Sequence, residues 1–499
     1  MTQGALPFKY EEEKKGLGLT ALGGLPLYLD MARVMDLAES IDRHVGVRKH
    51  SQGWTDSQVV MSLIMMNIAG GNCVDDLKVL EHDEGFRQVM LNCRWYGKRR
   101  KERRRLQRRW RKQCNRAVPS ASSVFRYLNA FGIDYEAKAG SAVIPEPSAD
   151  TQGFAQVNKD LLSFVQRCRR QSVATLDMDA TLVASQKSEA LYCYKGFSAY
   201  QPLNTWWAEQ GLMVHSEFRD GNVPAGYEQL RVFKEALRCL PDGIDQVQLR
   251  SDTAGYQHDL LKYCDSGEDP RFGKIEFAIG CAVSKQFKQA VEEVCEQDWQ
   301  PMFIEKDGQK IATGRQWAEV CFVPEEIGTR KNGPSYRYLA TRQVIEEQRN
   351  LPGMDDDKPY PFATMSRKDR KYKVFGIVTN KDQNGNDLIN WLYKRCGHSE
   401  EVHRAMKDDF AGGTLPCGGF GQNTVWWWIM LLALNLNAVM KRLVLGGHWA
   451  TRKMKAVRFG LIHIAARVIT TGRQLIIRCG RAVAWLVDIR SKIEKLCPS

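Results

Sequence analysis

The chain has 499 residues, of which 43% are hydrophobic and 26% are charged, a composition that excludes collagen-like and intrinsically disordered chains. This length predicts more than one domain, because single hydrophobic cores stop growing near ~250–300 residues. Lys and Arg (72) outnumber Asp and Glu (58), so the net charge of +14 favours an anionic partner.

Two segments carry most of the positive charge. Residues 94–116 hold thirteen Lys and Arg and one acid, and residues 441–499 hold thirteen Lys and Arg and two acids. The rest of the chain is therefore mildly acidic. Extended basic segments of this kind suit a polyanion such as nucleic acid better than a small acidic substrate.

The sequence predicts a cytoplasmic protein with no membrane partner. The first fifteen residues lack the apolar stretch of a secretory signal and are acidic where a signal is basic. The longest apolar run, residues 425–440, is shorter than the ~20 residues that a bilayer requires, so it predicts a core helix. The cysteines show no CxxC spacing, which is typical of reduced thiols.

Residues 1–153 predict a helical N-terminal domain that binds DNA and takes part in assembly. Thr55 and Asp56 form a plausible N-cap for a helix over 58–69, which Gly70 and Gly71 end. The Arg-rich residues 94–116 have too few apolar side chains for a core. Further helices are expected at 27–45, 75–90 and 122–131, followed by a linker at 132–153.

From residue 154 the pattern changes to α/β. Residues 172–185 alternate apolar with small or acidic side chains, the period of a strand, and strands and helices then alternate up to residue 298. A β-rich insertion, together with the chain that leads back from it, is expected at 299–372. The second part of the α/β domain is expected at 373–445. Basic C-terminal helices are expected at 446–499.

Acidic residues at the predicted ends of strands indicate a possible metal or phosphate site. Asp177 and Asp179 lie two apart, so they leave one face of a strand, where a cation would offset their repulsion. Asp252 follows another strand, at the position where α/β active sites lie. The structural alternatives are a strand end in solvent for the pair and a helix N-cap for Asp252.

A predicted helix carries a third group of polar residues. Glu400, His403, Arg404 and Lys407 share one helical face. Just upstream, Tyr393 and Arg395 supply groups that suit phosphate. The structural alternative is a solvated, salt-bridged face.

These residues belong to ten short segments that together resemble the DDE transposases of bacterial insertion sequences, in the branch with a β-rich insertion before the final Glu. The segments follow one another in the family's order along nearly the whole chain. They are LTALGGLPLYLDMAR (19–33), GGNCVDDLKVLEHDEGFR (70–87), PSASSVFRYL (119–128), LDMDATL (176–182), YQPLNTW (200–206), FRDGNVPAGYEQL (218–230), LRSDTAGYQHDLLKYC (249–264), VTN (378–380), YKRCGHSEEVHRAMKDDF (393–410) and LLALNLNAVMKR (431–442).

The resemblance implies a ribonuclease-H-like catalytic domain in which Asp179, Asp252 and Glu400 hold two Mg²⁺ ions, or Mn²⁺ in their place. Asp177 is the reserve candidate for the first acid or a neighbour that supports it. Arg395 lies five residues before Glu400, where the family usually has four, and Tyr393 is only two residues before Arg395. This departure puts the roles of both in question and leaves Glu401 as a rival acid.

The activity that the resemblance implies is transposition: cleavage of DNA at the element ends, followed by joining of the 3′-hydroxyl to target DNA. The partners would be double-stranded DNA and a second copy of the chain, in the bacterial nucleoid. The residues expected to contact DNA are Tyr393, Arg395, Arg404, Lys407, Arg103, Arg104, Arg105, Arg108, Arg109, Arg467 and Arg473.

Three other functions remain as alternatives. Residues 176–183 also resemble the first motif of haloacid-dehalogenase-type phosphatases, with Asp177 as nucleophile and Asp179 as acid/base. Two later motifs of that family are in the wrong order here. The acidic residues 355–357, which resemble its fourth motif, precede the Thr-containing residues 376–380, which resemble its second. A nuclease of the same fold without strand joining and an inactive DNA-binding relic of a transposase are the other two.

Overall fold

The computed structural model forms two compact units. The helical unit comprises Met1–Ile133, Pro147–Val157 and Ala405–Ser499, and the sheet unit comprises Asp134–Glu146 and Asn158–Arg404. Residues 405–445, which we expected in the α/β domain, thus belong to the same unit as both chain ends. The structure describes residues 16–50, 52–110, 114–133, 141–306, 308–324, 336–345, 360–367, 370–472, 474–480 and 483–497.

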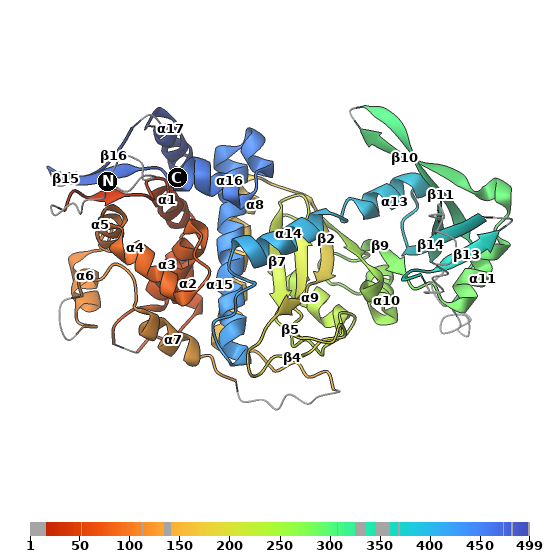
Figure 1. Ribbon diagram of the computed structural model, residues 1–499, viewed down its shortest axis with the longest axis horizontal. Coiled ribbons are helices and arrows are strands. Elements are labelled where there is room, and N and C mark those ends of the chain that lie inside the picture. Colours follow the sequence, from red (N-terminus) through yellow and green to blue (C-terminus); the bar gives the residue numbers. More distant parts are fainter. Residues whose placement is uncertain are drawn as a thin grey trace, which may run out of the picture. The chain divides into compact units, whose positions relative to one another are not determined.

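In the helical unit, segments from the two ends of the chain lie together (Figure 1). The expected helices over 27–45 and 75–90 are each present as two shorter helices. The N-terminal helices are α1 (Pro26–Val34), α2 (Leu37–His44), α3 (Asp56–Ala69), η1 (Val74–Asp76), α4 (Leu77–His82), α5 (Glu84–Cys93), α6 (Arg100–Gln107) and α7 (Ala121–Asn129).

The ends of α3 follow the prediction. The Thr55 side chain accepts a hydrogen bond from the Gln58 backbone N–H (3.2 Å), and the Gln58 side chain accepts one from the Thr55 N–H (3.2 Å). This reciprocal cap satisfies two N–H groups that the helix itself leaves unpaired. Gly70 ends the helix at φ 111°, a conformation that glycine adopts without a steric penalty.

The long apolar run forms the core helix α15 (Phe420–Val439), which continues as η5 (Met440–Leu445). α15 packs against α1, α3 and α7 of the same unit. The continuous helix Phe420–Leu445 is long and apolar enough to cross a membrane by length and composition, and 72% of its apolar window is buried inside the structure. This burial agrees with the interpretation as a core helix.

The prediction of helices throughout residues 446–499 is wrong for residues 466–479. This stretch forms a β-hairpin of β15 (Ala466–Thr471) and β16 (Gln474–Cys479), and β1 (Leu19–Thr20) pairs with β15. Its Val, Ile and Thr side chains are β-branched and favour strands. The remaining elements of this stretch are η6 (Gly447–Thr451), α16 (Met454–Val457), η7 (Arg458–Ile462) and α17 (Val483–Glu494).

The sheet unit is built on a ten-stranded sheet in the order β10-β11-β12-β14-β9-β8-β2-β6-β7, with β13 paired to β14. Its strands are β2 (Val173–Ala180), β6 (Leu203–Trp207), β7 (Leu212–Glu217), β8 (Gln246–Ser251), β9 (Glu276–Cys281), β10 (Gln300–Lys306), β11 (Gln309–Val320), β12 (Arg337–Val344), β13 (Thr364–Arg367) and β14 (Arg370–Thr379). A small second sheet contains β3 (Val183–Ala184), β5 (Ser198–Tyr200) and β4 (Leu191–Tyr192).

The strands predicted within 299–372 extend the central sheet. β12 pairs with β14, and β14 pairs with β9, so the insertion is hydrogen-bonded to the strands that precede it in the chain. The β10–β11 hairpin extends outward at the far end of this sheet (Figure 1). The helices of the sheet unit are the larger part of α8 (Ala149–Cys168), then η2 (Thr253–Gly255), α9 (Gln229–Cys239), α10 (His258–Ser266), α11 (Lys285–Glu293), η3 (Glu296–Asp298), α13 (Gly385–Tyr393) and α14 (His398–Arg404).

Candidate active site

Two acidic side chains predicted from the sequence lie together at the carboxyl ends of two neighbouring strands. β2 and β8 run parallel with Met178 opposite Ser251, so Asp179 and Asp252 are the next neighbours along the two strands. Adjacent strands lie ~4.8 Å apart. The Asp252 carboxylate is close enough to raise the pKa of Asp179. The carboxyl ends of these parallel strands therefore form a compact acidic site.

The environment of Asp179 disfavours its charge. Burial is the main cause that raises the pKa of Asp179 to about 6, the Arg395 guanidinium lowers it, and the neighbouring Asp252 raises it further. A carboxylate that is buried beside a second carboxylate is a place where a cation would be stabilised.

Asp252 also has the capping role that was the structural alternative. Its Oδ1 accepts a hydrogen bond from the Ala254 N–H (3.0 Å) at the start of η2. This bond holds the carboxylate at the end of β8 and involves one of its two oxygens. Capping and cation binding are therefore compatible at this residue.

Asp177 lies deeper in the sheet and is held by Arg250. The Arg250 Nε and Nη2 donate to the two carboxylate oxygens of Asp177 at 2.6 and 2.8 Å, and both residues are buried. Arg250 Nη1 also donates to the Trp391 carbonyl (2.7 Å), so one guanidinium links β2, β8 and α13. Because both oxygens of Asp177 accept from Arg250, Asp179 is the better placed of the two acids to bind a ligand.

The helix α14 covers the face of the sheet on which the acids lie. Asp177 pairs with Trp206 and Asp179 pairs with Asn204 on β6, and directly paired residues point to the same side of a sheet. The ring of His398 packs edge-on to Trp206 with centroids 5.6 Å apart.

The other end of α14 is bonded to the same strand. His403 Nε2 lies 3.2 Å from Asn204 Nδ2, and Asn204 Oδ1 accepts from the Ser216 hydroxyl (2.7 Å). α14 therefore follows β6 toward the edge that carries Asp179.

Helical spacing does not distinguish Glu400 from Glu401. At ~100° per residue, Glu400 is about 60° and Glu401 about 160° from His403 around α14, but the order is reversed relative to His398, which packs on the same strand. Glu401 pairs with Arg404, with its two oxygens 2.9 and 3.2 Å from Nη2 and Nε. Within the described residues, no three His, Cys, Asp or Glu side chains are close enough together to hold a metal ion. A role for Glu400 as the third acid stays a prediction.

Tyr393, Arg395 and Lys407, which were also proposed from the sequence around Glu400, contact different parts of the protein. The Tyr393 hydroxyl lies 3.4 Å from the Thr341 hydroxyl, and Arg315 stacks over the Tyr393 ring at 5.6 Å, so this side chain faces the inserted strands. Arg395 is buried, and its Nη1 lies 3.1 Å from Asp179 Oδ2. Lys407 falls in the π-helical turn η4 (Ala405–Asp409), so α-helical spacing, which placed it on one face with Glu400, ends at Arg404.

The arginines of the N-terminal basic segment divide into two kinds. Arg103, Arg104, Arg105 and Arg108 are exposed on or just after α6, a helix with no buried residue. Arg109 is half-buried and donates to the carbonyls of residues 53 and 48, each at 2.9 Å. The latter therefore anchors the segment to the helical unit.

The two C-terminal arginines are placed differently from the expectation of helical spacing. Arg467 lies exposed on β15, and its Nε donates to the Leu17 carbonyl (2.8 Å). Arg473 lies outside the described residues.

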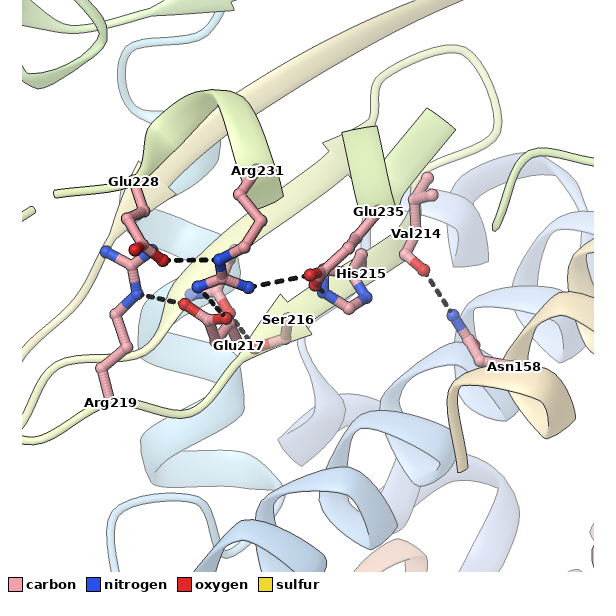
Figure 2. A network of polar contacts seen from close by, with 10 residues as sticks. Asn158, Val214, His215, Ser216, Glu217, Arg219, Glu228, Arg231 and Glu235 are labelled. Carbon is pink, nitrogen blue, oxygen red and sulfur yellow. Dashed lines mark hydrogen bonds and ion pairs between the residues drawn. The ribbon is translucent and has the colours of Figure 1, made fainter. Parts of the chain in front are cut away.

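A network of ion pairs fastens β7 to α9 in the sheet unit (Figure 2). Arg231 lies at its centre, 2.6 Å from a Glu217 oxygen, 2.5 Å from Glu228 and 2.8 Å from Glu235. Arg219 donates to the other Glu217 oxygen (2.6 Å). β6 lies between β7 and the acidic strand β2, so the network supports the sheet beside the site.

His215 extends this network into the core. Its Nε2 lies 3.1 Å from Glu235 Oε2. Burial opposes protonation, but Cys239 and Glu235 outweigh it and raise the pKa of His215 to about 9. Burial likewise opposes the charge of Glu235, but His215 and Arg231 lower the pKa of Glu235 to about 2. Both groups are therefore charged at neutral pH.

The sequence interpretation missed Arg250 and Asn204 as residues of this region, and it named His403 only as part of the polar face of a helix. Arg250 lies on β8 two residues before Asp252, which directly follows the strand, so a period of two would have indicated a common face. The contact between Asn204 and His403 depends on the register of β6 and the path of α14 and has no signal in the linear sequence.

Comparison with known proteins identifies a family. A family model described as "Transposase DDE domain group 1" matches residues 9–341 and 362–497. No curated protein matches the chain. Among solved structures, a chain of "Cryo-EM structure of piggyBac transposase synaptic complex with hairpin DNA (SNHP)" is similar over 95% of this chain and 85% of that chain, at 11% identity and a TM-score of 0.40. A likeness at this TM-score supports no conclusion about fold or function.

Proposed function

Because the chain belongs to the DDE transposase family, we propose that Asp179, Asp252 and Glu400 form the acidic trio of a DNA-cleaving and strand-joining site. Water cleaves a phosphodiester at the end of a mobile element, and the freed 3′-hydroxyl then attacks target DNA at the same site. The observation that carries this proposal is the meeting of Asp179 and Asp252 at the carboxyl edge of two parallel strands.

The location of the acids supports a ribonuclease-H-like catalytic domain. β2 and β8 are neighbouring interior strands of the large sheet, and open α/β sheets bind ligands at the carboxyl ends of their strands. The strands of residues 299–372 lie between Asp252 and Glu400 in the chain, as in the branch with a β-rich insertion. We propose that this part of the sheet contacts DNA near the site of cleavage.

Divalent metal ions are generally used by domains of this family. The residues present fit such an ion, because Asp179 and Asp252 offer hard oxygen ligands and their mutual repulsion needs a positive charge. We propose Mg²⁺, with Mn²⁺ as a substitute. When bound, such ions activate the attacking oxygen and stabilise the leaving oxygen.

The residues of the chain have distinct tasks in this site. Asp179 and Asp252 would hold the ion from adjacent strands, and Glu400 on α14 would supply the third carboxylate. The Asp177–Arg250 pair keeps β2, β8 and α13 in register beneath them.

Phosphate contacts that bring the DNA to the site are proposed at exposed arginines 103–105 and 108. A homodimer that holds two element ends and acts on DNA of the bacterial nucleoid completes the proposal.

Cleavage assays with purified variants in Mg²⁺ test the acidic trio. Asp179→Ala, Asp252→Ala and Glu400→Gln should each lower strand cleavage by more than ~100-fold, since even changes behind the ligands cost ~10–100-fold. DNA binding should persist, because phosphate contacts elsewhere are unchanged. Glu401→Gln is the matched control one residue along the same helix and should still cut.

Two outcomes would reassign residues. Cutting that survives Glu400→Gln but not Glu401→Gln would make Glu401 the third acid. Cutting that survives Asp179→Ala would remove Asp179 from the trio.

Strand joining needs its own assay, in which a pre-cleaved end with a free 3′-hydroxyl is mixed with plasmid DNA. Joined products support a transposase, whereas cleavage without joining would identify a metal-dependent nuclease.

A further inference from the structure

We propose that Arg395 occupies the cation position of Asp179 in the DNA-free protein and must leave it before a metal ion binds. This inference rests on the proposed function, because it takes Asp179 and Asp252 as the metal ligands. Its consequence is that metal and DNA bind cooperatively, with Arg395 as the residue that couples them.

The first observation is the position of the guanidinium. Arg395 Nη1 lies 3.1 Å from Asp179 Oδ2, and the side chain is 10% exposed. Arg395 therefore places a positive charge on the carboxylate that also faces Asp252. A divalent ion bound to the same oxygen would lie within a few ångströms of the guanidinium, where two positive charges repel each other strongly.

The second observation is that Arg395 is incompletely paired. Its Nε is buried and has no hydrogen-bond partner within the described part of the chain. Arg250, which lies opposite Asp177 on β8, donates through three nitrogens to Asp177 and to the Trp391 carbonyl. Buried polar groups are normally satisfied, so Arg250 is a fixed structural group, whereas Arg395 gains additional bonds if an oxygen-rich ligand arrives.

The backbone allows the side chain to move without a change of fold. The Arg395 N–H donates to the Leu392 carbonyl (3.1 Å), and its own carbonyl accepts from the Ser399 N–H (3.0 Å). The main chain is thus held between the end of α13 and the start of α14. The flexible stem can swing while these two bonds persist.

A DNA phosphate is the ligand that suits the released guanidinium. Arginine binds phosphate through two parallel N–H···O bonds, a geometry that would also satisfy its unpaired nitrogen. Phosphate that draws Arg395 from Asp179 makes room for the metal, and metal that displaces Arg395 makes it available to phosphate. Such coupling is reciprocal by thermodynamic necessity.

The test is the affinity of the full-length protein for Mn²⁺, measured by the paramagnetic signal of the free ion, with and without a short DNA duplex. The signal of an Asp179→Asn variant serves as the background for other Mn²⁺ sites. We expect duplex to tighten Mn²⁺ binding to the wild type by about tenfold, the lower end of the effect of an adjacent Arg on an Asp. Arg395→Ala and Arg395→Met should bind Mn²⁺ about tenfold more tightly than the wild type without DNA, and duplex should add little.

Arg395→Met retains the length and packing of the stem and guards against a fold defect in the alanine variant. Lys274→Gln is the charge control, because it removes one positive charge from an exposed ion pair with Asp265 (2.9 Å) in the same unit. Its Mn²⁺ affinity should match that of the wild type. An equal gain in Lys274→Gln would mean that net charge, not Arg395, sets the affinity.

The result that overturns the inference is unchanged or weaker Mn²⁺ binding by both Arg395 variants. A different result would refute the proposed function itself. If the wild type and Asp179→Asn bind Mn²⁺ equally in the presence of duplex, Asp179 is not a metal ligand.

Discussion

Two aspartates two residues apart on β2 should have opposite effects on stability when each is replaced by its uncharged isostere. Burial raises the pKa of both carboxyl groups, but Asp177 accepts two hydrogen bonds from buried Arg250, which Asp177→Asn would disrupt, whereas Asp179 has one contact with Arg395 and also faces Asp252. We predict that Asp177→Asn is less stable than the wild type and that Asp179→Asn is more stable.

The magnitude for Asp179 follows from its pKa, which is raised from 3.8 to about 6, chiefly by burial. The difference of about 2 units, at about 1.4 kcal/mol each, means that the ionised group costs roughly 3 kcal/mol of folding free energy. Because the folded pKa lies above the unfolded one, the cost is complete above pH 6 and shrinks as the pH falls toward 3.8. At pH 5 it should be about half as large.

The loss of stability in Asp177→Asn depends on the Arg250 charge that remains without its partner. Removing one member of a buried ion pair strands the other charge and typically costs about 3–5 kcal/mol. Arg250 would keep only its bond to the Trp391 carbonyl at full strength.

The assay is urea unfolding of the sheet unit in the full-length protein, followed by tryptophan fluorescence at pH 8 and pH 5. The reasoning is refuted if Asp179→Asn is no more stable than the wild type at pH 8, or if its gain is equal at both pH values. It is also refuted if Asp177→Asn is as stable as the wild type.

Three further predictions concern other parts of the chain. Replacing arginines 103–105 together by Ala should weaken binding to all DNA sequences alike and make the slope of log affinity against log salt shallower by up to about 3, measured by titration at several salt concentrations. Cys239 and Glu235 together raise the pKa of His215 from 6.5 to about 9, so protonated His215 should contribute on the order of 2–3 kcal/mol below pH 6.5 that is lost as the pH rises through 9; in denaturant curves of Glu235→Gln this loss should be smaller. Thr55→Ala should cost about 1 kcal/mol by removing the cap of α3, whereas Thr55→Ser should be nearly neutral in thermal melts.

Local signals in the sequence predicted the elements that depend on neighbours in the chain. The cap at Thr55 and the stop at Gly70 set the ends of α3 because their hydrogen bonds lie within four residues. The period-two pattern predicted β2 for the same reason, since alternate side chains of a strand face opposite sides. The strand over residues 466–471 was missed because its apolar residues also fit a helical spacing, and pairing with β16 decided the matter.

The sequence also predicted which acids belong to the site, but not how they are held. Asp179 and Asp252 were found because each comes at the end of a predicted strand, and parallel strands bring such ends together. The partner of each acid depends on side chains that are distant in the chain: Arg250 for Asp177 and Arg395 for Asp179.

The composition and motif order of the chain by themselves determined that it is a basic, multidomain α/β protein with acids at the ends of strands. The tertiary structure alone decided that Asp177 is neutralised by a buried arginine while Asp179 faces a second acid. The physical reason is that the free energy of a buried charge depends on what lies within a few ångströms of it. Sheet register and helix packing bring those groups together from residues as far apart as 179 and 395, a separation at which spacing in the sequence carries no information about distance.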